Sequence, residues 1–176
     1  LLLVLTAGML RFNHNQLKLE VVNRLIRTAT DISEAIPPFV DAGETYLSHL
    51  SANNLIRSGT PEQAGFILDL VGNSSSYFDQ LILLNSSGQS LTSFPPHLDS
   101  EVSQVVTQTI GFEEILNSAT PLVIPAISND DGSQLQLNFF VGITNPEVDL
   151  SRILWGRTPL FNTGAERSAF GILRNF

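Results

Sequence analysis

The stretch from Tyr77 to Pro95, YFDQLILLNSSGQSLTSFP, constrains the fold more than any other part of the chain, because it fits a β-hairpin. Leu81–Leu84 is an unbroken apolar run, which is typical of a central strand covered on both faces. The segment Asn85-Ser86-Ser87-Gly88 has turn residues, with Gly88 at the position that favours a positive φ. Pro95 and Pro96 cannot donate to a sheet ladder, so the second strand ends there.

Three further strands follow this hairpin in the sequence. A helix from Asp99 to Asn117, bent near Gly111, separates them from the hairpin. We predict these strands over Pro121–Ser128, Gln134–Thr144 and Arg152–Thr158, with a turn around Gly132 between the first two. Sequential strands joined by short turns predict an antiparallel sheet with helices on at least one face.

Helical patterns dominate the part of the chain before the hairpin. Apolar residues recur every three or four positions from Val22 to Ile36 and again from Phe39 to Leu50, which predicts helix over 11–58. Pro37-Pro38 predicts a kink or a restart within it. Thr60-Pro61-Glu62-Gln63 predicts a second helix start, and we expect that helix to end at Gly72. The fold class is therefore α+β: a long N-terminal helix packed on a five-stranded antiparallel sheet, with further helices.

The first ten residues, LLLVLTAGML, carry no charge. A spanning helix needs about 20 apolar residues, so this run is too short to cross a bilayer alone. We expect residues 1–10 to be the end of a membrane-spanning helix. A signal-peptide core, although no basic segment precedes it, and a buried helix end are the alternatives.

Composition and motifs argue against several function classes. The net charge of −8 opposes nucleic-acid binding, because phosphate contacts need a basic face. The chain has no cysteine, which excludes thiol catalysis and Cys-ligated zinc. His14, His49 and His97 lack metal-ligand spacing, and Glu113-Glu114 point apart on a helix. No nucleophile elbow or phosphate-binding loop is present in the sequence. We therefore expect no enzyme activity, no cofactor and no metal.

The order of these elements, with YFDQLILLNSSGQSLTSFP as the first hairpin and ILWGRTPL as the last strand, resembles the Cache family. These are PAS-like extracytoplasmic sensor domains of bacterial signalling receptors, and the resemblance is to the double-Cache type. It implies a PAS-like sensor module over 59–160, after the helix of 11–58. Residues 161–176 would connect to a membrane-proximal module outside this chain.

One region departs from the amino-acid-sensing members of that family. They carry an aromatic and arginine signature after the second strand, where this chain has FPPHLDSEVSQVV. That segment contains no Arg, Trp or Tyr. The resemblance therefore supplies no binding residue for this chain and does not support an amino-acid ligand.

If a pocket exists, we expect it between the sheet and Pro95–Val102, where a PAS-like core opens. Tyr77 and Asp79 would share one face of the first strand, because side chains in a strand alternate with a period of two. Trp155 and Arg157 would share one face of the last strand for the same reason. Together with His97 and Asn138, these four residues form the predicted lining of the pocket. Arg157 would bind an anionic group and Asp79 a cationic one, which favours a zwitterion or a small acid. The alternatives are a packed Trp155, a surface Asp79–Arg157 ion pair and an ordinary loop histidine.

The favoured function is an extracytoplasmic ligand-sensing domain of a membrane-anchored signalling protein: a histidine kinase, a diguanylate cyclase or a chemoreceptor. The resemblance also implies a homodimer in the full-length receptor. We expect Val22–Ile36 to be available to that partner and Phe39–Leu50 to pack on the sheet. The alternatives are an interaction or structural domain of an exported protein that binds no small ligand, and a cytoplasmic PAS or GAF-type regulator, which the leucine run disfavours.

Overall fold

The computed structural model describes residues 23, 26–27, 30–31, 33–96, 111–127, 135–145 and 150–160. The chain divides into two compact units, Leu1–Phe39 and Val40–Phe176. Residues 33–51 are helical. The other helices are α2 (Asn54–Ser58), α3 (Pro61–Ser74) and α5 (Phe112–Asn117). The strands are β1 (Gln80–Asn85), β2 (Ser90–Phe94), β3 (Leu122–Ile127), β4 (Leu135–Asn145) and β5 (Leu150–Pro159).

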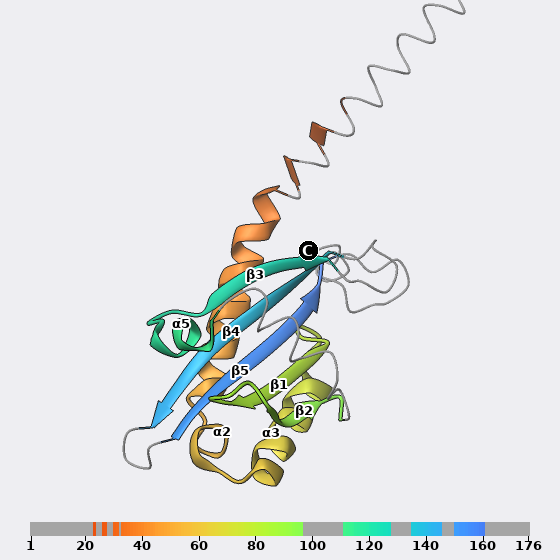
Figure 1. Ribbon diagram of the computed structural model, residues 1–176. Helices are drawn as coiled ribbons and strands as arrows, with labels where there is room; N and C mark the ends of the chain where they lie inside the picture. The colour runs from red at the N-terminus through yellow and green to blue at the C-terminus, as the bar shows by residue number, and fades with distance from the viewer. Residues whose placement is uncertain are drawn as a thin grey trace, which may run out of the picture. The chain divides into compact units, whose positions relative to one another are not determined.

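The five strands form one antiparallel sheet in the order β2-β1-β5-β4-β3 (Figure 1). The α+β prediction is therefore confirmed. Leu81–Leu84 is buried on both faces, as its apolar run predicted. The run is interior rather than central, however, because β5 at the middle of the sheet pairs with both β1 and β4.

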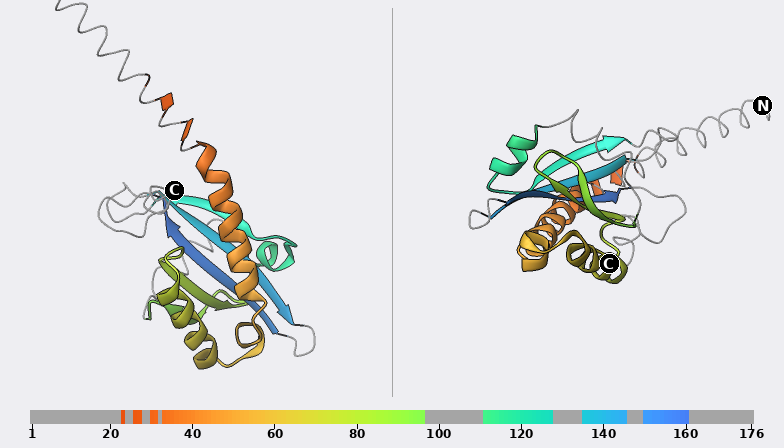
Figure 2. Two further views of the ribbon diagram at one scale, coloured as in Figure 1. Left: turned by 180° about the vertical axis from the view of Figure 1, so that it is seen from behind. Right: turned by 60° about the horizontal axis from the view of Figure 1, so that its bottom comes forward.

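The sheet has two differently covered faces. We call one the helical face: residues 40–51, α2 and α3 cover it (Figure 2). The other is the α5 face, which α5 partly covers. Leu83, Phe139 and Leu154 point to the helical face, and Phe140 and Trp155 point to the α5 face. The two sets alternate along each strand, as the period of two requires.

Aromatic packing fastens residues 40–51 to the helical face. Tyr46 stacks on Tyr77 at a centroid distance of 6.4 Å and lies 5.8 Å from the ring of Phe78. Gly43 provides the close approach, since a Cβ there would lie 2.5 Å from the Tyr77 hydroxyl and 2.7 Å from Phe139. The C-terminal half of the predicted helix therefore packs on the sheet, as expected.

Local signals in the sequence determine the start of α3 and the hairpin turn. Thr60 and Gln63 form a capping box, and Gly88 has a φ of 80°, both as predicted. The predicted end of α3 at Gly72 is wrong, because the helix continues to Ser74. Gly72 is instead the residue that lets the ring of Phe94 pack against α3.

The helix does not restart at Pro37-Pro38, because helical backbone runs without a break from residue 33 to residue 51. Both prolines and Ser33 and Glu34 are exposed, so solvent can satisfy the carbonyls that lose their donors. Residues 1–22, the turn at Gly132, residues 97–110 and residues 161–176 lie outside the described residues. Within the part that is described, no helix is long and apolar enough to cross a membrane.

Candidate ligand-binding site

The α5 face has an apolar half that belongs to the core. Trp155 stands opposite Phe140 in the β4–β5 register, and their rings stack at 5.6 Å with an interplanar angle of 24°. Ile115 of α5 and Ile82 and Ile153 of the sheet pack around them. Trp155 is only 3% exposed. Its ring is therefore packed in the core, as the alternative of a packed Trp155 predicted.

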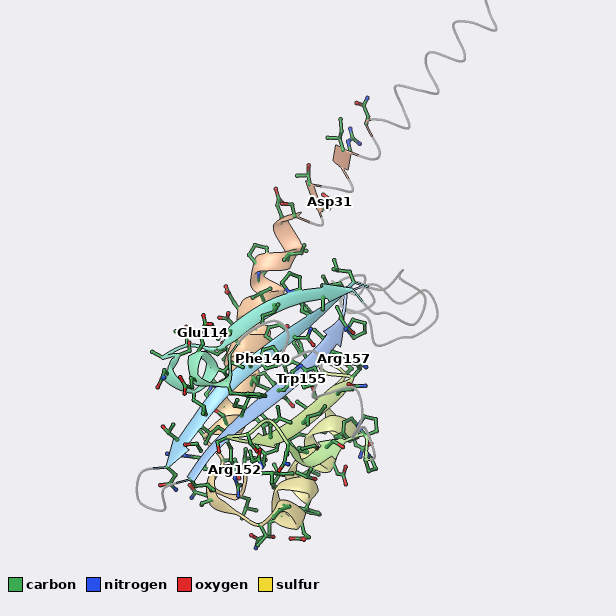
Figure 3. All side chains as sticks on the ribbon, viewed as in Figure 1. Asp31, Glu114, Phe140, Arg152, Trp155 and Arg157 are labelled. Atoms are coloured by element: carbon green, nitrogen blue, oxygen red, sulfur yellow. The ribbon has the colours of Figure 1, made fainter. Side chains whose placement is uncertain are left out.

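The other half of this face is polar. Asn138 and Arg157 stand directly opposite one another in the β4–β5 register (Figure 3 labels Arg157 and Trp155). The indole Nε1 of Trp155 donates to Asn138 Oδ1 at 3.0 Å. Arg157 Nη2 lies 3.5 Å from Asp79 Oδ2, and the backbone N–H of Asp79 donates to the Arg157 carbonyl at 2.9 Å. We call Asp79, Asn138, Trp155 and Arg157 the polar cluster.

Three buried atoms of this cluster have no hydrogen-bond partner within the described residues. They are Asn138 Nδ2, Arg157 Nε and Asp79 Oδ1. Leaving a buried donor or acceptor unpaired costs about 1–3 kcal/mol, so such atoms are rare and call for an explanation. Two donors and one acceptor at one place are complementary to a small polar ligand.

Burial dominates the electrostatics of Asp79. Desolvation raises the pKa of the Asp79 carboxyl, although the nearby Arg157 guanidinium lowers it in opposition. The charged form of Asp79 is therefore incompletely compensated in this structure. The side chain of Asp79 is only partly buried, at 31% exposure, and carboxylates with a perturbed pKa of this kind occur at functional sites more often than elsewhere.

The structure thus brings together four of the six predicted site residues. Tyr77 lies elsewhere: its ring packs with Tyr46 and Phe78 on the helical face, and burial raises the pKa of its phenol. The reason is that β1 begins only at Gln80, so Tyr77 and Asp79 do not follow the alternation of a strand. His97 and most of the predicted covering segment lie outside the described residues.

A buried arginine on the helical face was not anticipated. Arg152, 6% exposed, donates through Nη1 to the Ile56 carbonyl at 2.9 Å and through Nη2 to the Gly59 carbonyl at 2.8 Å. Burial lowers the pKa of its guanidinium. Arg152 thereby binds the end of α2 to the sheet. The signal in the sequence was its position inside an apolar strand, RILWG, where a cation requires partners.

The helical side also carries an apolar groove of about 680 Å³. Its walls come from the helix around residues 41–53 and from α3: Asp41, Ala42, Thr45, Tyr46, His49, Leu50, Asn53, Ile67, Leu70 and Val71. Phe66 and Leu70 of α3 are 67% and 57% exposed. No residue of the predicted site lies in it. Among the described residues, no group of His, Cys, Asp or Glu side chains could hold a metal ion.

Comparison with solved structures identifies the fold. An extracellular ligand-binding receptor from Desulfohalobium retbaense superposes with a TM-score of 0.57 at 12% identity, covering 83% of this chain and 33% of its own. The ligand-binding domain of the Pseudomonas aeruginosa chemoreceptor PctC, in complex with GABA, gives 0.56 at 17% identity, covering 78% and 61%. That of the Pseudomonas fluorescens chemoreceptor CtaA, in complex with L-serine, gives 0.55 at 15%, covering 73% and 55%.

These similarities concern the fold. The chain has the architecture of ligand-binding domains of bacterial chemoreceptors, and it spans less than two thirds of the length of each of the three. No protein-family model matches the sequence, and no curated protein matches it.

Proposed function

We propose that this chain is the extracytoplasmic ligand-sensing domain of a membrane-anchored bacterial signalling protein and that its ligand binds at the polar cluster. The observation that carries the proposal is the set of three unpaired buried atoms on the α5 face. A sheet that served only as a scaffold would gain stability from apolar residues there. The sensor-domain fold supports the same conclusion.

Signalling requires that the ligand favour one of two packings of the domain. A ligand shifts such an equilibrium only by its differential affinity for the two states, about 1.4 kcal/mol for each factor of ten. The ligand would act on β5, which carries Trp155 and Arg157 on one face and Arg152, bound to α2, on the other. The sheet would thus connect the site to the helices. The membrane tether, the dimer and the kinase, cyclase or chemoreceptor output belong to this proposal as well.

A thermal-shift screen against a metabolite library tests the proposal. A ligand at 100 times its Kd should stabilise the domain by about 2.7 kcal/mol. Arg157→Ala should remove this response while changing the melting temperature of the free domain little. Arg27→Ala, at an exposed arginine before the sheet, is the matched control and should respond like the wild type. A ligand response that survives Arg157→Ala would contradict the site.

The second candidate is an interaction domain that binds no small ligand. The groove beside α3 favours it, because Leu70 exposes apolar surface there and Phe66, one turn earlier on the same helix, is exposed as well. Replacing both by Ser should then abolish partner binding. This second function would be favoured if the library screen finds no ligand and the double Ser variant loses partner binding.

A further inference from the structure

We propose that Asn138 and Arg157 together bind a small carboxylate, and that Asp79 competes with this carboxylate for Arg157. The inference rests on the proposed function, since it names the class of ligand for the same site. It also narrows the choice between a zwitterion and a simple acid in favour of the acid.

The two donors lie where one carboxylate can reach both. Asn138 and Arg157 are directly opposite on neighbouring antiparallel strands and on the same face, so their Cβ atoms are about 4.5–5.5 Å apart. Each offers an N–H that is buried and has no partner among the described residues. A carboxylate has two oxygens and accepts hydrogen bonds from two such donors at once. A single amine could use neither of them.

Trp155 orients the amide of Asn138. The indole N–H can only donate, so the atom that it meets at 3.0 Å must be the amide oxygen. A flipped amide would bring two donors together. The NH₂ group of Asn138 is therefore directed away from Trp155 before any ligand arrives. Such preorganisation lowers the entropic cost of binding.

Asp79 holds Arg157 only loosely. The separation of 3.5 Å between Arg157 Nη2 and Asp79 Oδ2 exceeds the 2.7–2.9 Å or so of a good charge-assisted hydrogen bond. Asp79 Oδ1 is buried and unpaired within the described residues. Asp79 is thus an incomplete partner for Arg157, and a ligand carboxylate that also bonds Asn138 can replace it.

Among the described residues, Arg157 is the charged group that acts on Asp79. Strand β2, on the other side of β1, carries no titratable residue. On α3, which packs on both strands, Glu62 and Asp69 are exposed. Arg152 is bound to the end of α2. Protonation of Asp79 would therefore release Arg157, and carboxylate binding should tighten as the pH falls.

The test uses four three-carbon probes that differ in charge: propionate, alanine, propylamine and propionamide. Trp155 is the only tryptophan of the chain, so its fluorescence reports on the site directly. Propionate should bind more tightly at about pH 5.5 than at about pH 7.5, because the pKa of Asp79 is raised and its protonation frees Arg157, and alanine should not outcompete it. Asp79→Asn should bind propionate more tightly than the wild type at about pH 7.5, and with a weaker pH dependence. Arg157→Ala should lose binding. The control Asp69→Asn, at an exposed carboxylate of α3, should behave as the wild type.

Several outcomes would overturn the inference. If alanine binds more tightly than propionate and Asp79→Asn weakens it, then Asp79 is an ammonium site, and only the function proposal survives. If propionamide binds as tightly as propionate, the site does not recognise the charge of the carboxylate. If none of the four probes binds, but a library ligand stabilises the wild type and not Arg157→Ala, the carboxylate class is wrong and the sensor site stands. If no library ligand is found either, both proposals fail.

Discussion

The two arginines of β5 differ in what surrounds them, although only four residues separate them. Arg152, labelled in Figure 3, lies on the helical face. Its two terminal nitrogens donate to the carbonyls of Ile56 and Gly59. Arg157 lies on the α5 face, where Asp79 is 3.5 Å away and Asn138 stands opposite with an unpaired NH₂. Arg152 has a structural role that the fold itself explains. The surroundings of Arg157 leave hydrogen-bonding capacity unused.

Burial alone therefore does not distinguish a site from a core. The helical face also contains unpaired atoms, Arg152 Nε and the fully buried Thr158 Oγ1. The remaining nitrogens of Arg152 are bonded, however, and Thr158 contributes a single hydroxyl. On the α5 face, in contrast, neighbouring side chains offer two donors and an acceptor at one place.

The largest effect is expected from Leu83→Ala on the helical face. Leu83 is fully buried, so the substitution should lower the free energy of unfolding by about 2–5 kcal/mol, measured by urea denaturation. Leu70→Ala is the control: Leu70 is exposed on α3, and its loss should cost less than about 1 kcal/mol. Equal costs at the two positions would contradict the assignment of Leu83 to the core.

Arg152→Met should have the next largest effect. It keeps the length of the side chain but removes two hydrogen bonds from a charged donor to carbonyl oxygens, each worth about 1.5–3 kcal/mol before compensation by packing. We expect a net loss of about 2 kcal/mol in the free energy of unfolding. Arg27→Met, at an exposed position, should change it little. If Arg152→Met is as stable as the wild type, the hydrogen bonds between β5 and the end of α2 do not stabilise the fold.

Gly43→Ala tests the close packing of the helix on the sheet. The added Cβ would lie 2.5 Å from the Tyr77 hydroxyl and 2.7 Å from Phe139. Overpacking should cost about 1–3 kcal/mol, although alanine is the better helix former by about 1 kcal/mol. Gly111→Ala meets nothing within 4 Å and serves as the control in thermal denaturation. If Gly43→Ala raises the melting temperature, the helix does not approach the sheet this closely.

Asp79→Asn should have the smallest effect on stability, and the sign of its pH dependence is informative. The pKa of Asp79 is raised above its ordinary 3.8, so the folded protein binds this proton more tightly than the unfolded chain does. The stability contributed by Asp79 is therefore greatest at low pH and decreases as the pH rises from about 4 through the folded pKa. Asp79→Asn should flatten this decrease and change stability at neutral pH by about 0–1 kcal/mol. A clear loss of stability at neutral pH would mean that the ion pair with Arg157 is structural.

Much of the fold could be predicted because local chemistry determines it. The run Leu81–Leu84, the Gly88 turn and the Thr60 capping box each have one favourable conformation, and each appears in the structure. Gly72 was misjudged for a tertiary reason: the packing of Phe94 against α3 is invisible in the sequence. The same holds for β5 at the centre of the sheet, because strand order depends on pairing between distant segments.

The site could be predicted only where strand periodicity applies. Trp155 and Arg157 share a face because they are two apart on β5, and Asn138 joins them through the β4–β5 register. Tyr77 does not join them, because β1 begins only at Gln80 and the alternation of the strand does not extend back to Tyr77. The hydrogen bond from Trp155 to Asn138, which converts a core residue into an orienting group, could not be derived from the sequence. Nor could the two carbonyls that hold Arg152, which lie more than 90 positions away.

The most direct test of the account is to measure stability and ligand response together in the two arginine variants of β5. With any ligand found in the library screen, Arg152→Met should lower the melting temperature of the free domain and keep the ligand-induced shift. Arg157→Ala should keep the melting temperature and lose the shift. The account is contradicted if Arg157→Ala destabilises the free domain as much as Arg152→Met does while the ligand still shifts it. Arg157 would then have the same structural role on its face of the sheet as Arg152 has on the other.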